Sequence, residues 1–416
     1  MLHLYNTMSR RKEVFEPLDD KQVKMFTCGP SIYRRPHVGN YRSFLWEDVL
    51  QRYLEYQSYE VRRVINFTDV EDKAIAEAEK EGEDVAELTG RVADHFFNDT
   101  GLLRIKLPPE IPRSSTSVDQ AVELIKILLG KKIAYWHDKD VFFDPLKFEG
   151  FGRLYRLDMS RWPKEKKRFR RDTYPGRRWN LGDFILWHGR RDDEGLFWET
   201  DIGQGRPSWN IQDPAMVTKH LGYRIDIACG GIDNIYRHHD YNLAVIEAAS
   251  GEEFSRYWVH GEHLLADGKK MSKSKGNIIY PEDLLQNGLT PLHVRFYLLY
   301  GHHRKRMNLT MGSYCKTAEK LDAFRKTVQG LLDPESAAAP RKNPEKTASE
   351  LIDGLLEDFK AYMDDDLRIQ GAFDAITDGV LRLASLKRDG RLTAADCRKI
   401  QENLGRIDQV LLVIFP

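Results

Sequence analysis

One short segment of the chain, residues 267–277, carries four lysines within seven residues. It reads Asp-Gly-Lys-Lys-Met-Ser-Lys-Ser-Lys-Gly-Asn, so a glycine lies near each end and small hydroxyl groups separate the lysines. Lysines on such a loop can stabilise negative charge that develops on phosphate in a transition state. We expect Lys273 to neutralise a pyrophosphate as it leaves, with Lys270 as a second catalytic residue. The simpler interpretation, a solvated basic turn, does not account for the full Lys-Met-Ser-Lys-Ser string.

A second segment, residues 27–40, includes His37, Gly39 and Asn40. An apolar run precedes it and an amphipathic pattern follows, which places it between a strand and a helix. Free N–H groups at a helix N-terminus attract phosphate, and Gly39 permits close approach of a ligand to the backbone. We therefore expect His37 and Asn40 to bind phosphates. Taken alone the pattern is weak, because a helix-capping asparagine beside a surface histidine would look the same.

The elements around these segments follow a βαβ pattern. In a doubly wound parallel sheet the loops at the carboxyl ends of the strands meet at one edge, where nucleotides bind. We predict two halves of one such α/β sheet, from residues 1–101 and 225–306, split by an inserted connective region at residues 102–224. The elements concerned are strands at residues 23–28, 61–67, 223–229 and 257–265 and helices at residues 41–57 and 240–250.

The inserted region holds a basic stretch, residues 161–178, with nine Lys and Arg residues. Aromatic residues, among them Trp162 and Phe169, are interleaved with the basic ones. Such a stretch can bind phosphates and stack on bases. A solvated surface loop is an equally good interpretation.

The C-terminal residues 307–416 predict a helical bundle. Apolar residues recur at helical spacing at Leu351, Leu355 and Phe359, and again between residues 404 and 411. A stretch rich in Pro and Ala at about residues 333–346 is typical of a linker.

Composition limits the class of protein. Lys plus Arg and Asp plus Glu number 64 each, so a nucleic-acid partner must meet a local basic patch. No apolar stretch predicts a membrane span, and the N-terminus lacks the pattern of a secretory signal. Four cysteines spaced far apart do not suggest a disulfide framework. These features favour a cytoplasmic protein.

Together, the His-x-Gly-Asn and Lys-Met-Ser-Lys-Ser elements resemble the two signatures of class I aminoacyl-tRNA synthetases. More narrowly, the chain resembles cysteinyl-tRNA synthetases over nearly its whole length. The resemblance implies a Rossmann-like catalytic domain that forms an aminoacyl-adenylate from an amino acid, ATP and Mg²⁺. The matching segments are residues 27–40, 66–73, 183–187, 205–209, 230–233, 238–239, 257–258, 270–277 and 363–367.

The resemblance also implies roles for residues around ATP. Asp233 is expected to hold the ribose, His37 and Asn40 the phosphates, and Lys273 the leaving pyrophosphate. Gly29, Gly39 and Gly231 are expected to belong to the same nucleotide site.

The amino-acid pocket departs from the family pattern. The family binds a zinc ion with two cysteines, a histidine and a glutamate, and here Asp213 and Asn242 stand at the positions of the second cysteine and the glutamate. Cys28, Asp213 and His238 can still hold zinc, since thiolate, carboxylate and imidazole are all zinc ligands. Without zinc, Asp213 would pair with a cationic or hydroxyl group of the substrate, and an amino acid other than cysteine would then be accepted. The expected pocket residues are Cys28, Thr68, Trp209, Asp213, His238 and Asn242.

The sequence also leaves two alternatives for the acceptor of the activated amino acid. The family usually carries an anticodon-reading module beyond the helical bundle, and we expect this chain to lack it. A related ligase of mycothiol synthesis, which joins cysteine to an amino-sugar inositol, lacks that module too. The expected acceptor is a tRNA 3′ end, met by residues 161–178 and 302–306, or alternatively a small-molecule amine.

Overall fold

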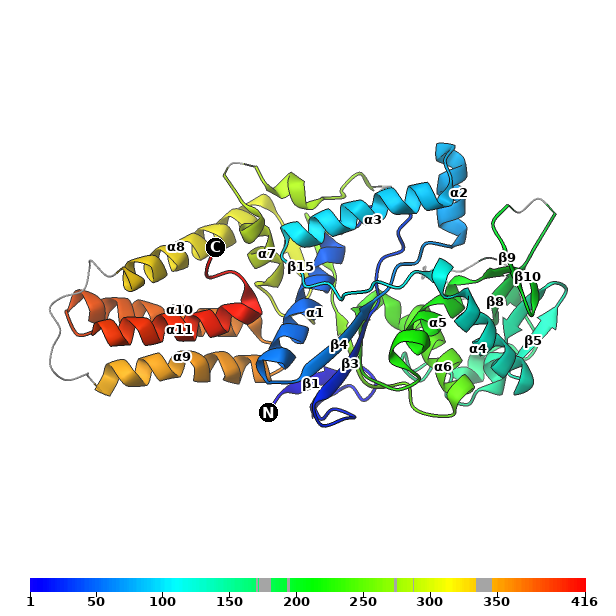
Figure 1. The fold of residues 1–416 in the computed structure, drawn as a ribbon, viewed down its shortest axis with the longest axis horizontal. Coiled ribbons are helices and arrows are strands. Elements are labelled where there is room, and N and C mark those ends of the chain that lie inside the picture. Colours follow the sequence, from blue (N-terminus) through cyan, green and yellow to red (C-terminus); the bar gives the residue numbers. More distant parts are fainter. Residues whose placement is uncertain (170, 172–180, 193–194, 273–274, 287, 334–345) are drawn as a thin grey trace.

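A computed structural model describes residues 1–169, 171, 181–192, 195–272, 275–286, 288–333 and 346–416. The molecule is elongated, with a central sheet in the middle, the inserted region at one end and a helical bundle at the other (Figure 1). Among the helices in these ranges, none has the length and apolar character needed to cross a membrane.

A four-stranded parallel sheet forms the centre, in the strand order β12-β11-β3-β4. Its elements are β3 (Gln22–Thr27), α1 (Val38–Tyr56), β4 (Glu60–Ile65), β11 (Ile225–Gly231), α6 (Asp240–Ser250) and β12 (Ser255–Gly261). The predicted α/β fold class is therefore confirmed. Helix α6 has the predicted bounds, and β3, α1, β4 and β11 differ from their predictions by no more than three residues at either end.

The strand predicted at residues 257–265 is wrong as a single element. The chain leaves β12 and continues as β13 (Leu264–Ala266), which belongs to a separate sheet with β14 (Lys269–Lys270) and β15 (Met307–Leu309). The pairing of β12 with β11 ends where Gly261 meets Gly231, and β13 pairs in parallel with β15 instead. Arg42 of α1 donates hydrogen bonds to the backbone carbonyl groups of Glu262 and Lys305, which supports this change of partner.

The inserted region contains a mainly antiparallel sheet in the order β5-β6-β8-β10-β9, with β7 paired in parallel to β8. Helix α5 joins this sheet to the central one, because Ile211 packs in the core of the inserted sheet and Leu221 in the core of the central one. The predicted domain limits at residues 102 and 224 stay predictions. The elements are α4 (Val118–Gly130), β5 (Ala134–His137), β6 (Asp140–Phe143), β7 (Arg168–Phe169), β8 (Asp183–Gly189), β9 (Trp198–Thr200), β10 (Gly203–Pro207) and α5 (Trp209–Leu221).

Helices α8 to α11 form the bundle at the other end (Figure 1). Leu355 and Phe359 are buried in it, as are Leu404 and Ile407, in agreement with the predicted apolar faces. The bundle core is continuous with side chains of α1 and α7 (Pro291–Leu299). Most of the predicted linker, residues 334–345, lies outside the described residues. The bundle helices are α8 (Met311–Leu332), α9 (Lys346–Asp364), α10 (Ile369–Arg388) and α11 (Ala394–Leu411).

The turn between α9 and α10 ties the bundle to the rest of the molecule. Asp364 accepts a hydrogen bond from the Tyr53 hydroxyl of α1, and Asp366 accepts one from the backbone N–H of Tyr5 in the N-terminal hairpin. Asp366 also pairs with Arg304 at 2.6 Å. The hairpin consists of β1 (His3–Asn6) and β2 (Arg11–Val14), and α2 (Asp72–Glu81) and α3 (Val85–Leu102) lie between β4 and the inserted region.

Candidate active site

A cavity of about 650 Å³ opens at the carboxyl edge of the central sheet. Residues that follow β3, β11 and β12 line it, together with the N-terminus of α1, as expected for a nucleotide site on a parallel sheet. Two predicted site residues are not part of this lining: Asn242 lies behind it, and Lys273 is outside the described residues. The predicted residues that do line the cavity are Cys28, Gly29, His37, Gly39, Asn40, Thr68, Trp209, Asp213, Gly231, Asp233, His238 and Lys270.

His37 and Asn40 cap the N-terminus of α1. The Nδ1 atom of His37 accepts a hydrogen bond of 3.0 Å from the Gly39 N–H, and Asn40 Oδ1 accepts one of 3.0 Å from the His37 N–H. A Cβ at position 39 would lie 2.8 Å from the His37 ring and 2.9 Å from the methyl group of Met271, so a larger residue would push the His37 ring out of its capping position. The capping interpretation of this pattern is therefore right, and the same residues also line the cavity.

The protonation state of His37 follows from this geometry. Because Nδ1 accepts a hydrogen bond, the ring proton of the neutral form lies on Nε2. Burial, and then the charge of Lys270, lower the pKa of His37 to about 4. At neutral pH the His37 imidazole is therefore uncharged and carries its one N–H at Nε2.

Lys270 and Asp233 form an ion pair at the cavity wall, with Nζ and Oδ2 2.7 Å apart. Burial alone would raise the pKa of Asp233, but the charge of Lys270 outweighs it and holds that pKa below the usual value. The side chains are 57% and 44% exposed, so a ligand in the cavity can displace one from the other.

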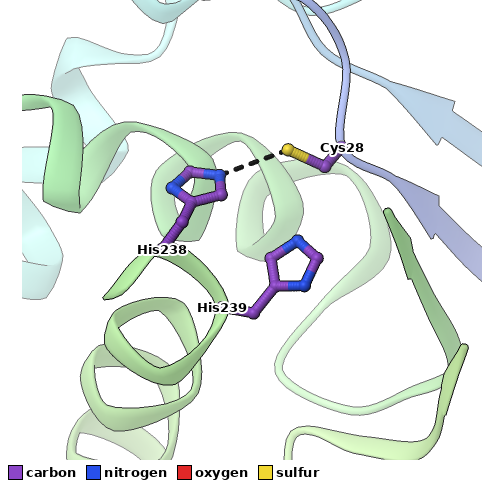
Figure 2. Close-up of side chains that lie close together, drawn as sticks. All are labelled: Cys28, His238 and His239. Carbon is purple, nitrogen blue, oxygen red and sulfur yellow. Dashed lines mark hydrogen bonds between the residues drawn. The ribbon is translucent and has the colours of Figure 1, made fainter. Parts of the chain in front are cut away.

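Cys28, Asp213 and His238 come from three separate segments and meet at the cavity wall. Cys28 Sγ lies 3.2 Å from His238 Nε2 and 3.7 Å from Asp213 Oδ2, and the latter two atoms are 2.7 Å apart. Figure 2 shows the contact between Cys28 and His238, with His239 beside them. Burial, and then the Asp213 carboxylate, raise the pKa of the Cys28 thiol. The structure thus brings together the three residues predicted as metal ligands.

Two further predicted pocket residues support this group. The Trp209 indole stacks on the His238 imidazole, with ring centroids 4.3 Å apart and planes inclined by 15°. Asn242 Nδ2 donates to Asp213 Oδ2 at 3.3 Å. Because Asn242 presents its donor to Asp213, it does not act as a ligand in this arrangement.

Sequence reasoning did not single out Asn66 or Asn234. Asn66 Nδ2 donates to Asp213 Oδ1 at 2.8 Å, and its Oδ1 accepts from the Gly29 N–H at 2.9 Å. Asn234 Nδ2 lies 3.6 Å from Cys28 Sγ. A signal was present, since Asn66 begins one of the segments that match the family and Asn234 directly follows another.

Only some of the basic residues predicted to bind a nucleic acid belong to the described part of the chain. In the basic stretch, residues 170 and 172–178 lie outside the described residues. In the loop at residues 302–306, His302 and Arg304 turn inward to Asp366, at 3.4 and 2.6 Å. Lys305 and Arg306 are exposed. A role of these residues in tRNA binding stays a prediction.

Comparisons with known proteins match this chain to tRNA synthetases. A family model described as the catalytic domain of class I (C) tRNA synthetases matches residues 14–319. A cysteine–tRNA ligase from Chlamydia pneumoniae is 36% identical over 99% of this chain and 86% of its own length. A cysteine–tRNA ligase from Oceanobacillus iheyensis is 35% identical over 91% of this chain and 79% of its own length.

Solved structures show the same fold at low sequence identity. Methionyl-tRNA synthetase from Mycobacterium tuberculosis, bound to methionyl-adenylate, superimposes with a TM-score of 0.68 at 16% identity and covers 95% of this chain and 90% of its own. A LeuRS from Agrobacterium radiobacter K84, solved with tRNA and LeuAMS, also has a TM-score of 0.68, at 12% identity over 96% of this chain and 85% of its own.

These findings bear out the resemblance stated from the motifs. The matches cover the helix α1 N-terminus, the Asp233 and Lys270 pair and the cluster of Cys28, Asp213 and His238. They do not favour ligation to a small-molecule amine. The chain belongs to the cysteinyl-tRNA synthetase family of class I aminoacyl-tRNA synthetases, which are ATP-dependent ligases.

Proposed function

We propose that this chain activates cysteine with ATP and Mg²⁺ as cysteinyl-adenylate and transfers the cysteinyl group to the 3′ end of a tRNA. One observation carries the proposal: a single cavity contains a helix N-terminus suited to phosphate and a cluster of Cys28, Asp213 and His238 that can hold a cation for a thiol-bearing side chain. The relatives are themselves named cysteine–tRNA ligases, which supports it.

The ATP half of the reaction uses the wall formed by α1 and β14. The ribose hydroxyl groups would bind Asp233 and displace Lys270, which is then free to approach the phosphates. The phosphates would bind at the α1 N-terminus, where His37 donates from Nε2 and the helix dipole favours negative charge. Lys273 would stabilise the leaving pyrophosphate, and Mg²⁺ would arrive with the triphosphate, to which it usually binds.

The donor set at Cys28, Asp213 and His238 fits a zinc-like cation. The three donor atoms lie within 3.7 Å of one another, and sulfur, nitrogen and oxygen of these side chains are all zinc ligands. When bound, the ion would act as a Lewis acid for the thiolate of the amino acid. Trp209 holds the His238 ring in place for this contact.

The acceptor half of the proposal rests on the tRNA-linked relatives and on basic side chains. Lys305 and Arg306 are exposed beside β15, and Lys164 and Arg171 are exposed in the basic stretch. Lysine and arginine on a surface bind the phosphate backbone, so the affinity for tRNA is expected to fall steeply with salt.

The test is attachment of radioactive cysteine to unfractionated tRNA by the purified chain. The proposal expects acid-precipitable label that depends on ATP and is lost when the tRNA is treated with ribonuclease first. Serine serves as the matched amino acid, because it replaces only the thiol by a hydroxyl. AMP release that depends on an added amine such as glucosaminyl-inositol, with no charging of tRNA, would overturn the proposed acceptor.

A further inference from the structure

Two ion pairs join Arg35, which lies two residues before His37, to distant parts of the chain. Its Nη2 and Nε atoms donate to the Asp99 carboxylate of α3, at 2.7 and 3.1 Å. Its Nη2 atom also donates to Glu282 Oε2 at 2.7 Å, and its Nη1 atom donates to Glu282 Oε1. A guanidinium group that binds carboxylates in this forked way fixes their orientation as well as their distance.

The two carboxylates differ in burial. The Asp99 side chain is 6% exposed and also accepts a hydrogen bond of 2.9 Å from the Tyr41 hydroxyl of α1, so it is a fixed partner. The Glu282 side chain is 51% exposed, and within the described part of the chain its carboxylate pairs with Arg35 alone. Burial alone would raise the pKa of Glu282, but the hydrogen bonds from Arg35 hold it below the usual value. Glu282 is therefore ionised at neutral pH and is held in place through Arg35.

The segment that leaves the lysine loop, as we call residues 267–277, is held against the start of α1. The Val38 N–H donates to the Ile279 carbonyl group at 3.0 Å. The Arg35 guanidinium lies over the Tyr280 ring, with its Cζ atom 4.7 Å from the ring centroid. These contacts add to the ion pair described above, so the two segments meet at three points.

The two sides of the lysine loop are tied to each other by Asn277. Its Oδ1 atom accepts from the Ser272 N–H at 2.9 Å, and its Nδ2 atom donates to the Lys270 carbonyl group at 3.3 Å. Lys270 in turn pairs with Asp233 at the cavity wall. The position of the segment after the loop therefore helps to set where Lys270 lies relative to His37.

We infer that Arg35 is a positioning residue for adenylate formation, and that its ion pair with Glu282 holds the base of the lysine loop at a fixed spacing from His37. Arg35 does not line the cavity, so it acts through groups that do. Misplacement of reacting groups by about 1 Å can cost about 100-fold in rate. The inference rests on the proposed function for the roles of His37 and Lys270 towards ATP.

Arg34 provides a matched control beside Arg35. It pairs with Glu77 of α2 at 2.7 Å, so its contact leads away from the lysine loop. Glu77 also pairs with Lys80, which leaves that carboxylate a partner when Arg34 is removed. Arg34→Ala thus removes an arginine–glutamate pair from the same segment and leaves the contacts of Arg35 in place.

The experiment measures ATP–pyrophosphate exchange by the full chain, normalised to the active sites that form adenylate in a single turnover. Arg35→Ala and Glu282→Ala should each lower kcat by about 10- to 100-fold. The KM for ATP should stay close to that of wild type, because neither residue lines the cavity. Glu282→Gln, which keeps one acceptor, should lose less than Glu282→Ala, and Arg34→Ala should keep the kcat of wild type.

A double-mutant cycle separates positioning from a merely structural role. In the Lys270→Ala background, Arg35→Ala should lower kcat by a much smaller factor than in wild type, because its effect depends on the position of that lysine. A structural role would give the same factor in both backgrounds and would overturn the inference. A loss in Arg34→Ala equal to that in Arg35→Ala would overturn it too.

Hydrogen–deuterium exchange separates this outcome from that of the proposed function. The Val38 N–H, which is bonded to Ile279, should exchange faster in Glu282→Ala than in wild type and at the wild-type rate in Arg34→Ala. If this result holds but wild type activates no amino acid, the contact between the two segments stands and the proposed function falls. If wild type activates an amino acid but Glu282→Ala matches it in kcat and in the exchange of Val38, the function stands and the inference falls.

Discussion

At the scale of single residues, His37 is a neutral donor where a charged imidazole would be expected. His37 is positioned by its own hydrogen bond from Gly39, and burial lowers its pKa to about 4. A phosphate site that relied on charged histidine would lose its donor charge as pH rises through about 6.5. Here the imidazole is already neutral well below that pH, so the contribution that we propose for it is a directed hydrogen bond.

The pH dependence of adenylate formation tests this state of His37. We expect the rate of ATP–pyrophosphate exchange to show no inflection near pH 6.5 that belongs to His37, because its proton is lost at a pH of about 4. His37→Asn should lower the rate by about 10²-fold, the usual cost of losing one donor to developing charge, with the shape of the pH profile unchanged. An inflection near 6.5 that disappears in His37→Asn would contradict the assignment.

Lys273 lies outside the described residues, and its expected role rests on the Lys-Met-Ser-Lys-Ser motif. Lys273→Ala should reduce the exchange rate by about 10²- to 10³-fold, because it removes a positive charge from the leaving pyrophosphate. Lys275→Ala is the matched control from the same loop, since Lys275 is exposed and has no assigned role. Equal rates for the two variants would show that Lys273 has no special function.

At the scale of elements, the turn between α9 and α10 is one place where the bundle is attached, besides its packing on α1 and α7. Asp366 is fully buried and contacts Tyr5, His302 and Arg304 from two other segments. Burial alone would raise the pKa of Asp366, but the hydrogen bond from His302 and the neighbouring charges hold it below the usual value. The neighbouring Asp365 is 39% exposed and pairs with Lys12 and Arg368 at the surface.

The two adjacent aspartates allow a matched comparison. Asp366→Ala should lower the free energy of unfolding by about 3–5 kcal/mol, because it leaves Arg304 and the Tyr5 N–H without their buried partner. Asp365→Ala should cost about 1 kcal/mol or less, as is usual for exposed ion pairs. Urea unfolding of both variants measures this, and similar losses would mean that the turn does not anchor the bundle.

At the scale of the whole molecule, several buried side chains have pKa values far from their ordinary ones. Burial, and then nearby positive charge, lower the pKa of His260 to about 3, and burial lowers that of His303 to about 3 in spite of the nearby Asp366. Burial raises the pKa of Glu47 to about 8 and that of Asp240 to about 7. The histidines make the fold less stable as pH falls, and the two acids make it less stable as pH rises.

A variant of His303 isolates one of these contributions. Below pH 6.5 the unfolded chain takes up a proton at this histidine and the folded chain does not until about pH 3. Stability from this group therefore falls by about 1.4 kcal/mol per pH unit in that window. His303→Phe keeps a ring against Trp46. As pH is lowered from 6.5 to 4, the free energy of unfolding of this variant should rise relative to that of wild type. If the free energies of unfolding of wild type and variant instead change in parallel with pH, His303 is not neutral in the folded chain.

Much of this arrangement could be predicted from the sequence, for local reasons. The segments at residues 27–40 and 230–233 follow parallel strands, whose carboxyl ends must meet at one edge of the sheet. The family motifs then placed Cys28, Asp213 and His238 together, as the structure does. The bounds of α6 were predictable because its apolar periodicity ends at Ser250 before a glycine.

The rest depends on contacts between distant parts of the chain. The break between β12 and β13 arises because β11 ends and β15 offers a new partner, which no local pattern contains. The contact of Asn66 with Asp213 spans 147 positions in the chain, so its role was not visible in either segment alone. His302 turns inward because Asp366, in the helical bundle, is its partner.

We propose that the chain activates a thiol-bearing amino acid in this cavity. The most direct test is ATP–pyrophosphate exchange, measured with each of the twenty amino acids. We predict exchange with cysteine at a rate about 10⁴-fold above that with serine, because a pocket built to bind one group strongly rejects the analogue that lacks it. Exchange that is fastest with serine or with a cationic amino acid would contradict the account and would identify Asp213 as the direct receptor of the substrate side chain.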